Sequence, residues 1–91
     1  MNAPRGEAEI DIDGVSYRLC LTLGGLAELE AAFACASLSE LVARLKRLSA
    51  LEMRCVLRIL LAEDLEEERL SAVPPGVAAR AIGEAFRAAL G

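Results

Sequence analysis

The sequence predicts an α+β fold in which an N-terminal antiparallel β-hairpin packs against about four short α-helices. Residues 7–22 alternate apolar and polar side chains with a period of two, and an Asp-Gly pair interrupts the alternation near its middle. After residue 22 the apolar residues repeat every three or four positions, as they do along one face of a helix. Because a lone two-stranded hairpin is only marginally stable in water, we expect the helices to cover it.

The hairpin is expected to turn at Asp13-Gly14, since Asp-Gly favours the positive φ angles of a type I′ turn. A two-residue turn fixes which residues of the two strands face each other. The register that follows places the apolar side chains of both strands on one face and the acidic residues of the first strand on the other. The expected opposing pairs are Ile12 with Val15 and Ile10 with Tyr17.

Four helices are expected after the hairpin, and each has a start signal or an apolar period. Thr22 has the side-chain type that caps a helix N-terminus. Ser37 and Ser49 each precede a glutamate by three positions, which is the pattern of a capping box. Pro75 suits the first turn of the last helix. The expected helices cover about residues 23–34, 38–48, 50–62 and 75–90. The sequence leaves open whether residues 66–72 form a further short helix.

The chain of 91 residues has room for one core, so residues 7–91 are expected to form a single domain behind a flexible arm at residues 1–6. Its formal charge of −4 argues against a general binder of nucleic acid or of an anionic membrane. No apolar run approaches the roughly 20 residues of a bilayer span, and the start lacks the apolar segment of a secretory signal. We therefore expect a cytoplasmic protein without a membrane partner.

The sequence contains few of the residues that usually form enzyme active sites or metal sites. The chain has no histidine, which removes the commonest general base and metal ligand. Its three cysteines are scattered without a C-x-x-C spacing, which favours reduced thiols. The Gly24-Gly25 pair does not match a phosphate-binding motif, and the acidic runs at 7–13 and 63–68 do not match a calcium loop, so we interpret both runs as solvated. We expect no enzyme activity, no catalytic residue, no cofactor and no metal.

The one basic concentration in this acidic chain lies between residues 44 and 58. Three interpretations stay open: a solvated or internally paired face, a docking surface for a protein partner, or a contact with nucleic acid. No aromatic residues are interleaved for base stacking, which makes nucleic acid the least favoured partner. The cationic residues are Arg44, Lys46, Arg47, Arg54 and Arg58, and the partner-binding residues that we expect are Arg44, Arg47, Leu51, Arg54 and Arg58.

The first third of the chain also carries a family resemblance. Its features are Gly6-Glu7, the Asp13-Gly14 turn, Tyr17-Arg18-Leu19 and, most specifically, the run LTLGGLAELE over residues 21–30. With these residues the chain resembles the gene transfer agent tail assembly chaperone-like family, also described as tail-tube-associated. Its members are small proteins encoded among phage-like tail genes. The acidic stretch at 63–69 departs from the glycine-rich link often found there.

The resemblance implies a non-enzymatic tail-assembly factor of a prophage or gene transfer agent. Its expected partners are the tail tube protein or the tape-measure protein, with a homo-oligomer also possible. Two alternatives remain open: a structural tail component retained in the particle, and a small nucleic-acid-binding regulator that uses the band from Arg44 to Arg58. The expected location is the cytoplasm or a phage-like particle.

Overall fold

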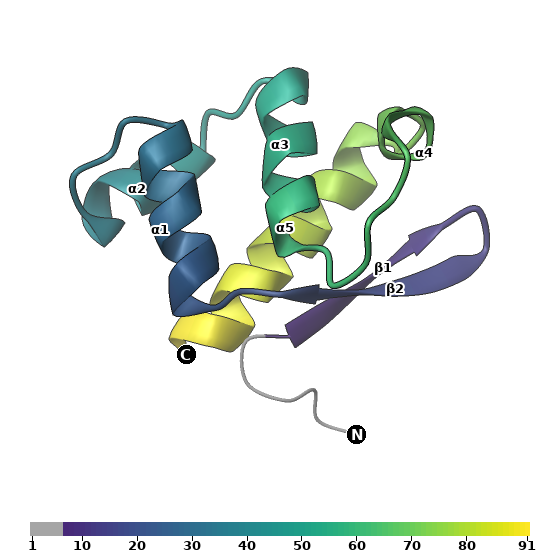
Figure 1. Ribbon diagram of the computed structural model, residues 1–91, viewed down its shortest axis with the longest axis horizontal. Helices are drawn as coiled ribbons and strands as arrows, with labels where there is room; N and C mark the ends of the chain where they lie inside the picture. Colours follow the sequence, from purple (N-terminus) through teal and green to yellow (C-terminus); the bar gives the residue numbers. More distant parts are fainter. Residues whose placement is uncertain (1–6) are drawn as a thin grey trace.

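The computed structural model describes residues 7–91 as a β-hairpin followed by five helices (Figure 1). This arrangement confirms the predicted α+β class. The arm expected at residues 1–6 lies outside the described residues. The elements are β1 (Glu7–Ile12), β2 (Val15–Cys20), α1 (Leu23–Ala32), α2 (Leu38–Leu45), α3 (Ala50–Leu60), α4 (Glu67–Ser71) and α5 (Pro75–Leu90).

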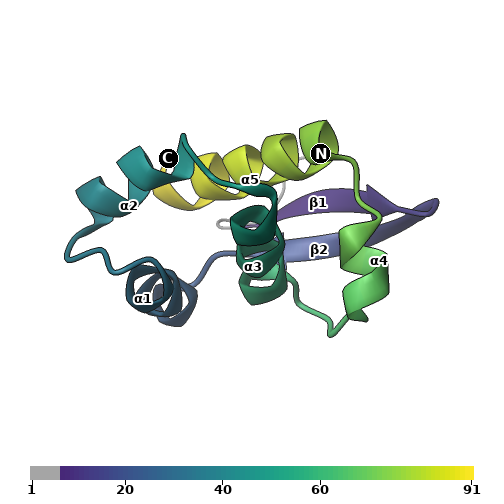
Figure 2. The ribbon, with the colours of Figure 1, turned by 90° about the horizontal axis from the view of Figure 1, so that it is seen from above.

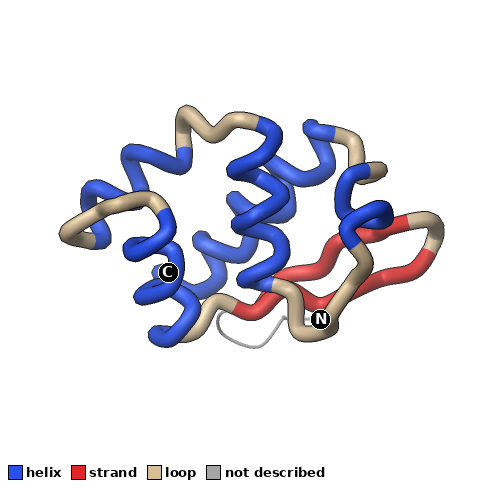
Figure 3. Tube along the Cα trace, turned by 45° about the horizontal axis from the view of Figure 1, so that its top comes forward, coloured by secondary structure: helices blue, strands red, loops and turns tan. Residues whose placement is uncertain are grey.

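The hairpin has the predicted turn and register. Asp13 and Gly14 adopt positive φ angles of 54° and 78°, as a type I′ turn requires. Ile12 lies opposite Val15, and Ile10 lies opposite Tyr17, as the predicted register requires. Val15 nevertheless remains 47% exposed, because it lies at the turn, which projects beyond most of the helices (Figure 3). The buried face of β2 therefore begins at Tyr17.

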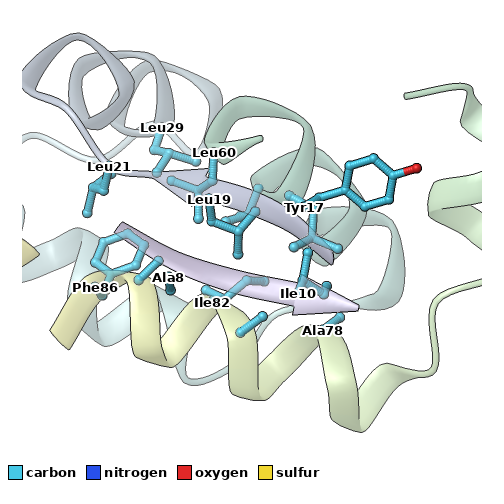
Figure 4. Packing of buried hydrophobic residues seen from close by; sticks show 14 of the residues in the cluster. Ala8, Ile10, Tyr17, Leu19, Leu21, Leu29, Leu60, Ala78, Ile82 and Phe86 are labelled. Carbon is cyan, nitrogen blue, oxygen red and sulfur yellow. The ribbon is translucent and has the colours of Figure 1, made fainter. Parts of the chain in front are cut away.

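The core lies between the apolar face of the hairpin and two helices. α5 runs along β1, and α3 contacts β2 (Figure 2). Phe86 lies beside Ala8 at one end of β1, whereas Ala78 lies beneath Ile10 at the other end (Figure 4). Leu19 of β2 is fully buried. The alternating strand pattern and the helical stripe of α5 thus meet in one hydrophobic cluster.

Three helices end earlier than the apolar period predicts. α1 ends at Ala32 rather than near residue 34. α2 ends at Leu45 rather than near residue 48, and α3 ends at Leu60 rather than at residue 62. After α3 the chain turns to pair with β2: Leu61 forms a bridge with Leu19, and the Ala62 N–H donates to the Arg18 carbonyl oxygen at 3.0 Å. Backbone pairing with the strand therefore replaces the last turn of the expected helix.

The short helix that the sequence left open over residues 66–72 exists as α4. It begins after Glu66 and ends at Ser71. Its single fully covered side chain is Leu70, which is 3% exposed. The guanidinium carbon of Arg69 lies 5.5 Å from the centre of the Tyr17 ring, within cation–π range. α4 therefore packs on the core and also contacts the hairpin through Arg69.

The predicted N-caps form, with one difference in detail. Thr22 Oγ1 accepts from the Gly25 N–H at 3.0 Å. Ser49 and Glu52 make both hydrogen bonds of a capping box. At the start of α2 the serine also caps the helix, but the Glu40 carboxylate accepts from the N–H of Ala36 at 3.0 Å. The glutamate thus reaches one residue beyond the cap residue and ties down the preceding loop.

The C-terminus of α1 places an alanine in the left-handed region. Ala34 has φ 55°, and the Cys35 N–H donates to the Glu30 carbonyl oxygen at 2.8 Å. The Ala34 N–H donates to the Ala31 carbonyl oxygen at 3.4 Å. These bonds form a Schellman motif, whose left-handed position is usually glycine. A side chain with a Cβ atom is disfavoured there by roughly 1–2 kcal/mol.

Ala34→Gly should therefore stabilise the protein by about 0.5–1 kcal/mol, because the relief of left-handed strain exceeds the extra entropy that glycine gives the unfolded chain. Chemical denaturation of both proteins measures the difference. Ala27→Gly, at an exposed interior position of α1, is the control and should destabilise by about 1 kcal/mol. An Ala34→Gly protein no more stable than the parent would contradict the assigned helix end.

Candidate functional site

The basic residues predicted as one partner surface are divided between two sides of α3. Arg44 forms an ion pair with Glu52, whereas Arg54 and Arg58 both pair with Glu67 of α4. Positions 52 and 54 point about 200° apart around a helix, since each residue turns it by about 100°. The arginines of this segment therefore do not form a single continuous face.

Arg44 connects three elements of the fold. Besides its ion pair with Glu52 at the start of α3, its Nη1 donates to the Arg47 carbonyl oxygen at 3.0 Å. Its guanidinium carbon lies 5.7 Å from the centre of the Phe33 ring at the end of α1. Arg44 thus holds the end of α1, the turn after α2 and the N-terminus of α3 together.

The Glu52 carboxylate has a lowered pKa. The largest cause is the hydrogen bond that it accepts from the Ser49 backbone N–H, and the Arg44 guanidinium lowers the pKa further. Partial burial acts in the opposite direction but does not prevail. The capping box and the ion pair therefore favour the same charged form of Glu52.

Arg54 and Arg58 hold α4 on α3. The Arg54 Nε lies 3.3 Å from Glu67 Oε1, and its Nη1 donates to Ser71 Oγ at 2.8 Å. Arg58 donates to both carboxylate oxygens of Glu67. Glu67 of the acidic run at 63–68 therefore pairs with both arginines while its side chain stays exposed to solvent. The short α4 has no side-chain N-cap, so these contacts anchor it.

Two of the predicted partner-binding residues remain available at the surface. Leu51 is 66% exposed at the N-terminus of α3, and the side chain of Arg47 is in no ion pair within residues 7–91. Leu51 and Arg54 line a hollow of about 310 Å³ between α3, α4 and α5. We name this hollow the α3–α4 groove. Its other lining residues include Met53, Leu57, Leu70 and Val73.

A larger groove of about 620 Å³ lies between α2 and residues 79–90 of α5. The two helices run on the same side of the molecule (Figure 2). We name it the α2–α5 groove. Leu45, Leu48, Met53, Ile82 and Phe86 supply its apolar wall. The remaining lining residues are Val42, Lys46, Ala79, Gly83, Arg87 and Leu90. Met53 lines both grooves, so they adjoin each other.

The sequence reasoning did not identify the α2–α5 groove, although two signals point to it. Apolar residues cover a wider arc of α5 than its contact with β1 requires, and Leu90 on that arc remains 46% exposed. Gly83 also lies in the middle of a 16-residue helix, where glycine is unfavourable. Of the two cations that line the groove, Lys46 belongs to the basic concentration at 44–58, whereas Arg87 lies outside it.

The described residues offer few side chains suited to an enzyme active site or to a metal site. Cys20, Cys35 and Cys55 are free thiols, each partly exposed. Residues 7–91 contain no cluster of three side chains placed to bind a metal ion. Within the same range no helix combines the length and apolarity that a bilayer span needs. The arrangement that residues 7–91 do offer is apolar surface bordered by cations.

Comparison with known proteins gives one family. The model of the family described as "Phage tail tube protein, GTA-gp10" matches residues 5–91, which include the hairpin and every helix of the structure. Comparisons with curated proteins and with solved structures gave no match. The match includes the run LTLGGLAELE over residues 21–30, which carries the most specific part of the resemblance.

The lowered pKa of Glu52 predicts a pH dependence. Because the folded state favours the carboxylate, this contribution to stability is present above the ordinary glutamate pKa and is lost as pH falls through the lowered value. An NMR titration should place the Glu52 pKa below its ordinary range, and Arg44→Gln should raise it. Arg80→Gln, on α5, should leave it unchanged. A Glu52 pKa at or above the ordinary value would contradict the contacts of Arg44 and Ser49.

Proposed function

Because the chain belongs to the phage tail tube protein family GTA-gp10, we propose that it is a non-enzymatic assembly factor for the tail of a prophage or gene transfer agent. It acts by binding other tail proteins while the tail is built. The tail tube protein and the tape-measure protein are the partners that this role requires. The place of action is the cytoplasm in which particles are assembled.

The observation that carries the proposal is the apolar surface around Met53. The α3–α4 groove and the α2–α5 groove adjoin there, and Leu51, Val42 and Leu90 are 66%, 37% and 46% exposed on or beside them. Contiguous apolar surface with a polar rim is typical of sites that bind proteins. We call this surface, formed by the two grooves together, the docking face.

The predicted partner-binding residues have different roles in this proposal. Leu51 and Arg47 contact the partner directly, since both side chains are exposed. Arg54 contributes from the wall of the α3–α4 groove, and Arg58 lies one helical turn further along the same side of α3. Arg44 acts indirectly, by fixing the turn that carries Arg47.

A second candidate function is a structural component that stays in the finished tail. The family description as a tail tube protein favours it. A component is present in purified particles at a fixed ratio to the other tail proteins, whereas an assembly factor is absent or substoichiometric. Mass spectrometry of particles separates the two roles. No observation favours the nucleic-acid regulator, because the chain has a formal charge of −4 and its basic residues are not interleaved with aromatic residues for base stacking.

Co-expression with the tail tube and tape-measure proteins of the same genetic element tests the proposal. The parent chain should co-purify with at least one of them. The double variant Arg54→Glu/Arg58→Glu should lose co-purification, because two cations at the partner surface become anions. Its circular dichroism should remain unchanged, since exposed ion pairs contribute only about 0.2–1 kcal/mol each.

Glu67→Gln is the matched control, because it removes the same ion pairs and keeps both arginines. It should still co-purify. If Glu67→Gln loses the partner as well, the arginines act only by holding α4, and the direct contact is wrong. Unchanged co-purification of the double arginine variant would exclude that surface. Failure of the parent chain to bind either tail protein would overturn the proposed function.

A further inference from the structure

We propose that the α2–α5 groove binds an amphipathic α-helix of a partner protein, with carboxylates flanking the apolar stripe of that helix. The inference deepens the proposed function and rests on it for the source of the partner, since it names the element by which a tail protein would be held. Three independent features of the groove carry it: its walls, its central glycine and its charge.

The walls of the groove are two helices that remain apart. α2 packs mainly against α1, and α5 packs mainly against β1 and α3. The side of α5 that faces the groove carries Ala79, Ile82, Gly83, Phe86 and Arg87, at helical spacings of three and four. Val42 and Leu45 face it from α2 at a spacing of three. Two helical walls that carry apolar side chains suit a third helix laid between them.

Gly83 avoids no close contact with other parts of residues 7–91. A glycine in a helix interior costs about 1 kcal/mol relative to alanine. A Cβ atom added at Gly83 would meet no atom within 4 Å, and its φ is not in the left-handed region. The missing side chain therefore relieves no internal clash. It leaves the backbone of α5 open to the groove, which allows the close approach of an external backbone.

The charges around the groove define the flanks of the partner helix. Lys46 and Arg87 line it, and neither is in an ion pair within residues 7–91. None of the carboxylates of residues 7–91 lines the groove, although the chain has a formal charge of −4. Opposite charge across an interface selects the partner and its register. Carboxylates on both sides of the apolar stripe would meet these two cations.

A synthetic peptide probe tests the inference without any tail protein. The probe is a helix of roughly four turns with leucine at i, i+3, i+4, i+7 and i+11 and glutamates flanking that stripe. A second peptide carries lysine in place of each flanking glutamate. We expect the glutamate peptide to bind the full chain at least about tenfold more tightly than the lysine peptide, as measured by fluorescence anisotropy.

Variants of the chain then locate the binding. Gly83→Glu should weaken the glutamate peptide about tenfold or more, because it places a side chain and a negative charge in the groove. Gly76→Glu is the matched control: it is also a glycine of α5 with open space around its Cβ position, but it does not line the groove. Lys46→Glu/Arg87→Glu should weaken binding similarly, whereas Arg80→Glu, elsewhere on α5, should not.

Each other outcome overturns the inference. No binding of the glutamate peptide, or equal binding of both peptides, would exclude an acidic amphipathic helix as the occupant. Equal effects of Gly83→Glu and Gly76→Glu would place the peptide elsewhere. Self-association of the chain in sedimentation experiments that Gly83→Glu abolishes would assign the groove to a second copy. None of these results bears on co-purification with tail proteins, which tests the proposed function separately.

Discussion

The burial of one face of the hairpin beneath α5 and α3 is the constraint on which the rest of this structure depends. A two-stranded hairpin alone is only marginally stable in water. Because apolar and polar residues alternate along its strands, only one of its faces is apolar and can be buried. Leu19 at 0% and Ile10 at 2% exposure lie where this face meets the helices. α1 and α4 attach to the assembly through Leu29 and Leu70, which are also buried. The hairpin in the N-terminal third of the chain thus supplies one wall of the core.

The same constraint determines which surface of the helices is left uncovered by the rest of the fold. α5 packs its apolar face against β1, and the edge of that face, with Ala79, Gly83 and Leu90, lines the α2–α5 groove. The cations divide in a similar way. Arg44, Arg54 and Arg58 connect elements of the fold through carboxylates, while Lys46 and Arg87 line the groove without such partners in the described residues. A small acidic protein therefore presents an apolar surface with a basic border, which suits an assembly role through protein contacts.

Short sequence motifs predicted the features that depend on neighbouring residues alone, namely the hairpin turn and the starts of the helices. Asp13-Gly14 sets the hairpin register, and Thr22, Ser37 and Ser49 start helices where side-chain oxygens meet free N–H groups. The end of α3 was mispredicted because Leu61 continues the helical period but pairs with Leu19, far away in sequence. The division of the basic band was missed for the same reason: the carboxylate partners Glu52 and Glu67 belong to other elements, which periodicity does not place.

Native-state amide hydrogen exchange of the full chain measures most directly whether the hairpin and α5 form the core on which the other elements depend. The slowest amides should belong to the β1–β2 pairs and to the middle of α5, opening only with global unfolding. Those of α2 and α4 should exchange faster, by opening that leaves the core intact. Hairpin amides that exchange before those of α2 and α4 would contradict the account.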